Sequence, residues 1–285
     1  MRRRPSIDLF RPAVALLFAG LLGAQAPASP PAPGAIAGME TLLAHRAAYS
    51  LTLERARDRS QIREAKGAMV FEVTDACEGW ATRQRLTMTL TDTDGNDIDT
   101  ASDYSTYESK DGRRLRFSMV QTANGAIRTQ VTGEALLEAD GSGVVRYAQP
   151  TVKEERLPPG TLLPMLHTLR AVQLARGGGR ILTAPLFDGT SEDGAQDSTT
   201  IIAGWSGPQP NERFPSLAAL SSARMRIAFF SRAPADGASG GASAPEYEVG
   251  LRYFENGVAD ELSMDFGEFA MGGRMLEMVP LPGGC

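Results

Sequence analysis

The stretch KGAMVFEVTDACEGWATRQRLTMTLT, from Lys66 to Thr91, decides the fold of this chain. Its two halves, residues 66–74 and 80–91, are rich in residues that favour β-strands. In the second half, alternate residues from Trp80 to Leu90 fall on one side of an extended chain. The stretch therefore predicts two neighbouring strands, with Cys77 between them.

Similar segments lie on both sides of this stretch, separated by turn residues. The pairs Asn124-Gly125 and Asn256-Gly257 are the strongest hairpin signals. Strands do not alternate with helices, so we predict an antiparallel sheet of about 12 to 14 strands. A sheet of this size must curl or close to protect its edges. The other predicted strands are 45–54, 97–108, 115–122, 126–137, 144–147, 180–187, 199–205, 224–231, 246–254, 258–269 and 274–279.

One segment departs from the β pattern. The sequence LLPMLHTLRAVQLAR, residues 162–176, predicts a single helix. Thr161 is the expected N-cap, and Gly177 is the expected stop signal. The apolar residues at helical spacing are Leu162, Leu166, Leu169 and Val172. The predicted fold class is mainly β, with one large antiparallel sheet and one buried helix.

The first 40 residues are predicted to lie outside the folded domain. Residues 1–28 combine four arginines, an apolar run and small residues at a cleavage point, which is typical of a signal peptide. Residues 29–40 are rich in Pro, Ala and Gly and predict a flexible lead-in. Residues 41–285 are then one domain. Within it, residues 232–245 predict a mobile surface loop.

The chain contains two cysteines, Cys77 and Cys285. In an exported protein, two thiols have one intramolecular disulfide available to them. That bond would tie the C-terminus to the first third of the chain. It would also indicate an oxidising compartment, which in a bacterium is the periplasm. The expected role of this pair is structural.

The charge balance excludes two classes of partner. The formal charge is −5, and removal of residues 1–28 takes away four Arg and one Asp, which leaves −8. No Lys or Arg cluster follows the leader, so binding to nucleic acid and electrostatic docking to anionic lipid are not expected. No later stretch is long and apolar enough to span a membrane.

Few residues could carry catalysis. His45 and His167 are the candidate bases, but no G-x-S-x-G nucleophile motif accompanies them. The acidic run Asp92–Asp97 begins like a calcium loop but lacks its glycine, and Asp103 replaces its final glutamate, so we expect a solvated hairpin turn. Zinc spacing, phosphate loops and dinucleotide fingerprints are missing, so we expect no metal and no cofactor.

Methionine is as frequent as phenylalanine, with eleven residues of each. Unbranched thioethers fill irregular cores, and they also line binding sites that adapt to varied partners. We expect the methionines of the strands either to pack the core or to line an apolar cavity for an acyl chain or a partner segment. These residues are Met69, Met88, Met119, Met225, Met264, Met275 and Met278.

Several stretches, taken in order, resemble one known family. They are HRAAYSLTL (45–53), GAMVFEVTDACEG (67–79), Tyr107-Glu108 with Asp111-Gly112, LPPGTLLPMLH (157–167), PLFDG (185–189), PEYEVGLRYFENGV (245–258) and residues 276–285. In these stretches the chain resembles the alphaproteobacterial envelope integrity protein B family, periplasmic proteins first grouped as a domain of unknown function.

The resemblance implies a spiral or open-barrel-like sheet wrapped around one helix. It also implies a disulfide between Cys77 and Cys285, and a role in envelope integrity and stress resistance without enzymatic activity. The spiral is similar to that of periplasmic lipoprotein carriers. A functional link to periplasmic tetratricopeptide-repeat proteins is a further implication.

Three functions compete at this point. The first is a non-catalytic, monomeric periplasmic protein that maintains the envelope by binding a partner protein or a lipid-like ligand. The second is a soluble carrier of lipoproteins or lipids. The third is an envelope hydrolase that uses His45 or His167. The poor catalytic inventory and the resemblance favour the first.

Overall fold

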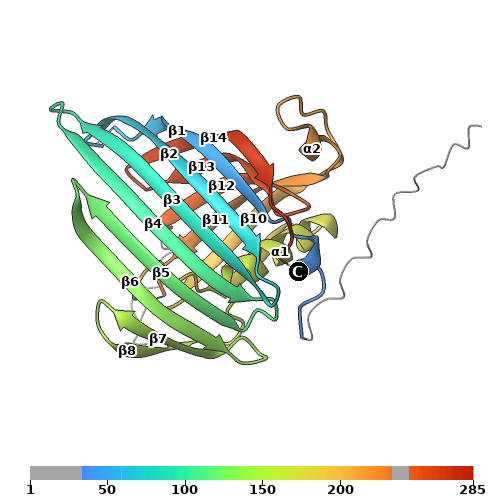
Figure 1. Cartoon of the computed structure of the whole chain (residues 1–285). Helices are drawn as coiled ribbons and strands as arrows, with labels where there is room; N and C mark the ends of the chain where they lie inside the picture. The colour runs from blue at the N-terminus through green and yellow to red at the C-terminus, as the bar shows by residue number, and fades with distance from the viewer. Residues whose placement is uncertain (1–33, 59, 233–243, 285) are drawn as a thin grey trace, which may run out of the picture. The chain divides into compact units, whose positions relative to one another are not determined.

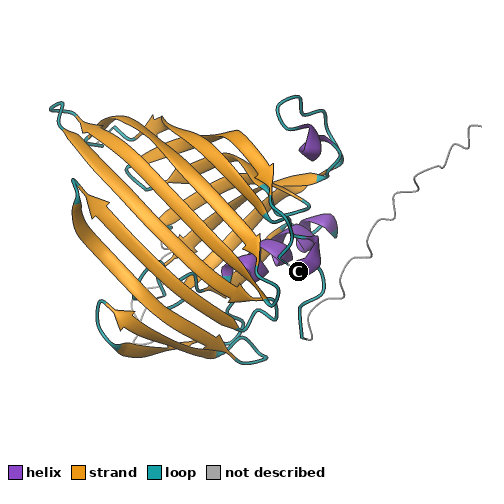
Figure 2. Ribbon diagram, viewed as in Figure 1, coloured by secondary structure: helices purple, strands orange, loops and turns teal. Residues whose placement is uncertain are grey.

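The computed structural model describes residues 34–58, 60–232 and 244–284. Fourteen strands of these residues form one antiparallel sheet (Figures 1 and 2). The strands are β1 (His45–Ala56), β2 (Ile62–Asp75), β3 (Gly79–Asp92), β4 (Asp97–Ser109), β5 (Arg114–Ala123), β6 (Ala126–Leu137), β7 (Gly143–Gln149), β8 (Lys153–Leu157), β9 (Ile181–Leu186), β10 (Gln196–Ser206), β11 (Ser222–Phe230), β12 (Tyr247–Phe254), β13 (Ala259–Asp265) and β14 (Phe269–Pro280). The predicted fold class is confirmed.

The order of the strands explains how the chain closes on itself. Strands β8 to β1 follow one another across one half of the sheet, and β14 to β9 follow one another across the other half. The pairing of β1 with β14 joins the two halves, so the first and last strands lie side by side at the centre. The outer strands β8 and β9 do not pair, and the sheet stays open there. Leu162 covers part of the β9 edge through backbone bonds to Pro185 and Phe187 of 2.9 and 3.0 Å.

The long helix α1 (Pro164–Arg176) lies at one end of the curled sheet (Figure 1). Its buried side is made by Leu166, His167, Leu169, Ala171, Val172 and Ala175. The end at Arg176 and Gly177 agrees with the prediction. The expected N-cap is wrong, because the Thr161 hydroxyl donates to the Pro158 carbonyl at 2.6 Å and the helix starts only at Pro164.

Three further predictions need correction. Residues 258–269, expected to be one strand, contain all of β13 and the first residue of β14, with a turn at Gly267 between them. Strand β8 and the one-turn helix α2 (Pro215–Ala218) were not expected. Part of the expected flexible lead-in is held against the domain: the N–H of Ile36 donates to the Lys110 carbonyl at 2.9 Å, and Met39 is fully buried in the 3₁₀ turn η1 (Met39–Thr41), while Gly34, Ala37 and Glu40 are exposed.

The predicted signal peptide, residues 1–28, lies outside the described residues, as do residues 233–243 of the expected surface loop. Among the residues that are described, no helix is both long and apolar enough to cross a bilayer.

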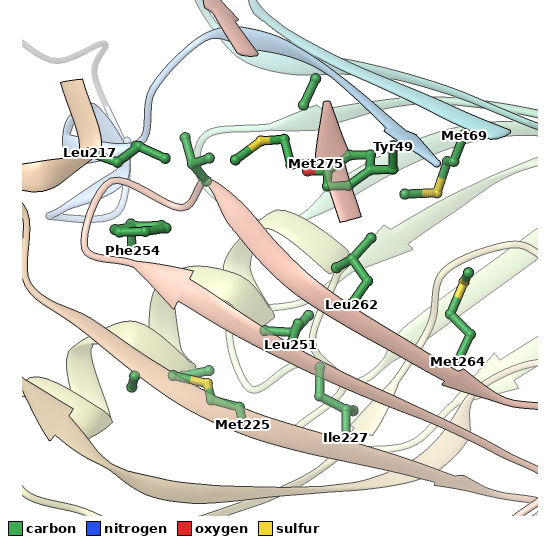
Figure 3. Close-up of a cluster of buried hydrophobic side chains, with 14 of the residues drawn as sticks. Tyr49, Met69, Leu217, Met225, Ile227, Leu251, Phe254, Leu262, Met264 and Met275 are labelled. Atoms are coloured by element: carbon green, nitrogen blue, oxygen red, sulfur yellow. The ribbon is translucent and has the colours of Figure 1, made fainter. Parts of the chain in front are cut away.

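The largest core cluster joins the two halves of the sheet. Most of its members come from the inner faces of β1, β2, β10, β11, β12, β13 and β14 and from α1, and Leu217 of α2 and the loop residues Phe214 and Val258 complete it. Figure 3 shows Tyr49 and Met69 of the first half near Leu262, Met264 and Met275 of the second. The concave side of the curled sheet is therefore its apolar side.

Candidate functional site

An apolar cavity of about 220 Å³ lies inside the curl, between the sheet and α1. We call it the narrow compartment. A single water needs only roughly 10–15 Å³ of such space, so this cavity can hold a larger molecule. It is lined by Leu42, Leu43, His45, Tyr49, Met69, Phe71, Val73, Gln84, Leu86, Met165, Thr168, Tyr247, Val249, Leu251, Tyr253, Asn256, Gly257, Ala259, Leu262 and Met264.

Strand alternation places these side chains. On β12, the residues Tyr247, Val249, Leu251 and Tyr253 all line the compartment, while the residues between them do not. The same period of two brings Met69, Phe71 and Val73 of β2 to the opposite wall. The curl of the sheet then sets the two apolar faces against each other across the lumen.

Most polar groups of the narrow compartment already bond to the protein. The Tyr49 hydroxyl donates to the Ala259 carbonyl at 2.7 Å, and burial raises the pKa of Tyr49 well above its ordinary value. The hydroxyls of Thr168 and Tyr253 bond to each other at 3.2 Å. Such groups fix the walls but leave little capacity to bind a polar ligand.

His45 lies at the wall of the narrow compartment and is 2 % exposed. Its Nδ1 lies 2.8 Å from the Leu43 carbonyl oxygen, which fixes the tautomer with the proton on Nδ1. Its Nε2 is buried and has no hydrogen-bond partner among the described residues. Burial lowers the pKa of His45, so the ring is neutral at neutral pH.

His167 lies in α1 and bonds to Thr200 of β10 instead, with Nε2 3.0 Å from Oγ1. The two residues are 3 % and 0 % exposed, and burial lowers the pKa of His167 to about 4. The pair therefore joins the helix to the sheet inside the core. Within the described part of the chain, the one side-chain hydroxyl that bonds to either histidine is that of Thr200, which is fully buried.

A second hollow, the wide compartment, adjoins the narrow one and has a volume of about 530 Å³. Met88 and Met119 line it, whereas Met69 and Met264 line the narrow one. Met225 and Met275 are buried in the core, and Met278 packs against it. Met69, Met119 and Met264 also belong to the buried core clusters, so the strand methionines pack the core and four of them line the hollows as well. The expected acyl chain or partner segment stays a prediction.

Sequence reasoning missed Glu108, a fully buried carboxylate on β4. It accepts hydrogen bonds from the backbone N–H groups of Met165 and Leu166 at 2.7 and 2.9 Å, and so caps the first turn of α1. Burial raises the pKa of Glu108 to about 8, and the two N–H donors oppose that rise. No local sequence signal could identify this cap, because it lies 57 positions before the residue it holds.

Cys77 occupies the turn between β2 and β3 with a positive φ of 66°. Its N–H donates to Asp75 Oδ1 at 3.0 Å, and its Sγ lies 3.5 Å from the carbonyl oxygen of Gly284. The last described residue of the chain is thus beside Cys77. Cys285 lies outside the described residues, so its bond to Cys77 stays a prediction.

The acidic run at 92–97 forms the turn between β3 and β4, as expected. The Asp92 carboxylate accepts from the backbone N–H groups of Asp94 and Asn96 at 2.9 and 2.8 Å and from Asn96 Nδ2 at 2.9 Å. These bonds lower the pKa of Asp92, the side-chain bond to Asn96 most of all. Its oxygens are occupied in stabilising the turn.

Comparisons with known proteins agree with this geometry. A family model described as EipB-like matches residues 36–282. The cell envelope integrity protein EipB of Brucella abortus (strain 2308) is 29% identical over 272 residues, which cover 93% of this chain and 91% of that protein. The crystal structure of a β-barrel-like protein of the domain of unknown function DUF1849 from Brucella abortus matches with a TM-score of 0.75 at 26% identity, over 85% of this chain and 99% of that chain. The resemblance identified from sequence is confirmed.

Proposed function

The chain belongs to the EipB-like family, and we propose that it is a non-catalytic periplasmic protein that maintains the cell envelope by binding a lipid-like ligand inside its sheet. The relative named above carries cell envelope integrity in its name. The expected signal peptide and the expected disulfide both favour the periplasm.

The observation that carries the proposal is the apolar lumen. The narrow compartment is lined mostly by Leu, Met, Val, Phe and Tyr side chains. The wide compartment lies within the range of roughly 300–1,000 Å³ that is usual for small-molecule sites. Burial of an acyl chain in such a space is favoured by about 0.8 kcal/mol for each CH₂ group removed from water.

The proposal is tested by filling the narrow compartment. Val249 lines it from β12, and Val249→Trp would place an indole in the space of the ligand. Ile201 on β10 is 54% exposed, so Ile201→Trp is a matched change outside the lumen. We expect the delipidated protein and Ile201→Trp to bind a dansyl-labelled fatty acid, and Val249→Trp to bind it at least tenfold more weakly.

Near-UV circular dichroism of each variant checks that the fold is kept. Ala259→Leu fills the same compartment with a smaller side chain and serves if the indole disturbs folding. Failure of the delipidated wild-type protein to take up any amphiphile would refute a lipid-binding role and leave a protein partner as the explanation of envelope maintenance.

A further inference from the structure

The two compartments are neighbours inside the curl, and together we call them the lumen. Gln84, Leu86 and Tyr247 line both of them, so the narrow and the wide space meet at these three side chains. The narrow compartment ends against α1, where Met165 and Thr168 contribute to its lining. The ring of Tyr247 lies between those of Phe229 and Phe266, at centroid distances of 6.0 and 5.2 Å, and all three line the wide compartment.

The polarity of the lumen changes along its length. Among the described residues, no Asp, Glu, Lys or Arg side chain lines the narrow compartment. The hydroxyls of Tyr49, Thr168 and Tyr253 bond to the backbone or to each other, and His45 Nε2 is the buried polar atom of this wall that has no partner among these residues. In the wide compartment the lining includes Gln121, Thr122, Gln196 and Arg128. This lining favours a molecule whose apolar part lies near α1 and whose polar part lies at the other end.

Among the charged side chains of the wide compartment, Arg128 is the one suited to an anionic head group, and the carboxylates Asp188 and Glu246 line the same space. Arg128 of β6 is exposed, is the one cation of the described lining, and takes part in no ion pair among the described residues. The acidic side chains of the same lining are already bonded. Glu246 accepts from Gln196 at 3.2 Å and from Ser231.

Asp188, the other acidic residue of this lining, accepts from the backbone N–H and the hydroxyl of Thr190 at 2.9 and 2.8 Å. Burial raises the pKa of Asp188, so it repels an anion less than an exposed carboxylate would.

We propose that the lumen binds an amphiphile with a single acyl chain, with the methyl end beneath α1 and an anionic head group at Arg128. The narrow compartment, at about 220 Å³ against about 530 Å³ for the wide one, is the smaller end of the lumen, and the single chain is assigned to it. The inference rests on the proposed lipid-binding function and adds the ligand class and its direction.

The direction can be read from the protein's own methionines. Met69 and Met165 line the narrow compartment, while Met88 and Met119 line the wide one. The protein, labelled with ¹³C at the methionine methyl groups, is titrated with stearic acid that carries a nitroxide near the methyl end or near the carboxyl. We expect the first probe to broaden the Met69 and Met165 signals most strongly, and the second to broaden those of Met88 and Met119. The reverse pattern, or equal broadening by both probes, would overturn the proposal.

The head-group contact is tested with Arg128→Gln. Because a hydrogen bond to a charged group is lost, the Kd for a fatty acid should rise about tenfold, while that for the corresponding methyl ester should stay within about twofold. Arg85→Gln is the matched control, since Arg85 lies on the outer face of β3, between the inward Gln84 and Leu86. Normal binding of both ligands by Arg128→Gln would refute the head-group assignment alone. Absence of binding by the wild-type protein would refute the proposed function itself.

Discussion

The burial of His167 against Thr200 predicts how the stability of the fold depends on pH. The pKa of His167 is lowered from its ordinary value of 6.5 to about 4, because burial disfavours the imidazolium. Protonation therefore favours the unfolded chain. The contribution of neutral His167 to the free energy of unfolding is therefore complete above about pH 6.5, and it is lost as the pH falls to about 4. The difference in pKa corresponds to about 3 kcal/mol of unfolding free energy.

The perturbation that isolates this effect is His167→Gln, whose side-chain amide can still bond to Thr200 but does not titrate. Unfolding by urea is measured for both proteins at about pH 7 and about pH 4. We expect the wild-type protein to lose about 3 kcal/mol more than the variant over this interval. Other groups that titrate in the window, such as Glu108 and His45, are present in both proteins and cancel in the comparison. Parallel losses in the two proteins would show that His167 is not a buried neutral base.

Three further predictions concern stability. Glu108→Gln should lower the free energy of unfolding by about 2–3 kcal/mol, because the NH₂ group of the glutamine would face one of the two N–H donors of α1. Amide exchange at Met165 and Leu166 should become faster at the same time. Gly189→Ala should lower the free energy of unfolding in urea by at least about 2 kcal/mol, since a Cβ there would lie 2.3 Å from the Phe117 ring and the residue has a φ of 74°. Gly95→Ala is the control: Gly95 has a φ of 88° but no atom within 4 Å of the added Cβ, so the loss should be only about 1 kcal/mol. If Cys77 is bonded as predicted, Cys77→Ser should lower the Tm by the equivalent of roughly 5 kcal/mol, and identical melting curves with and without reductant would refute that bond.

The sheet could be predicted because its signals are local. Residues 126–137 were assigned with the observed bounds, since Asn124-Gly125 marks the hairpin before them and both residues adopt the positive φ that this turn needs. Strand β8 was not predicted, because its sequence KEERL has four charged residues in five and lies between two proline-containing turns. The turn at Gly267 was not predicted, because Phe266 and Phe269 on either side of it continue the apolar pattern of a strand.

The sequence could predict that an apolar cavity exists, but not which residues line it. The methionine-rich strands indicated an apolar cavity, but alternation alone does not say which faces meet across it. Met69 and Met264 line the same compartment only because β2 and β13 lie on opposite sides of the β1–β14 junction in a curled sheet. Glu108 and Arg128 acquire their positions from the same long-range curvature. No short stretch of sequence encodes that curvature, so their roles could not be inferred from their neighbours.

We propose that this protein maintains the envelope through its apolar lumen. The most direct measurement is complementation of a strain that lacks the gene, scored by detergent resistance at matched protein levels. We predict that the wild-type protein and Ile201→Trp restore resistance and that Val249→Trp does not. Full restoration by a folded Val249→Trp protein that no longer binds the fatty acid would contradict the claim.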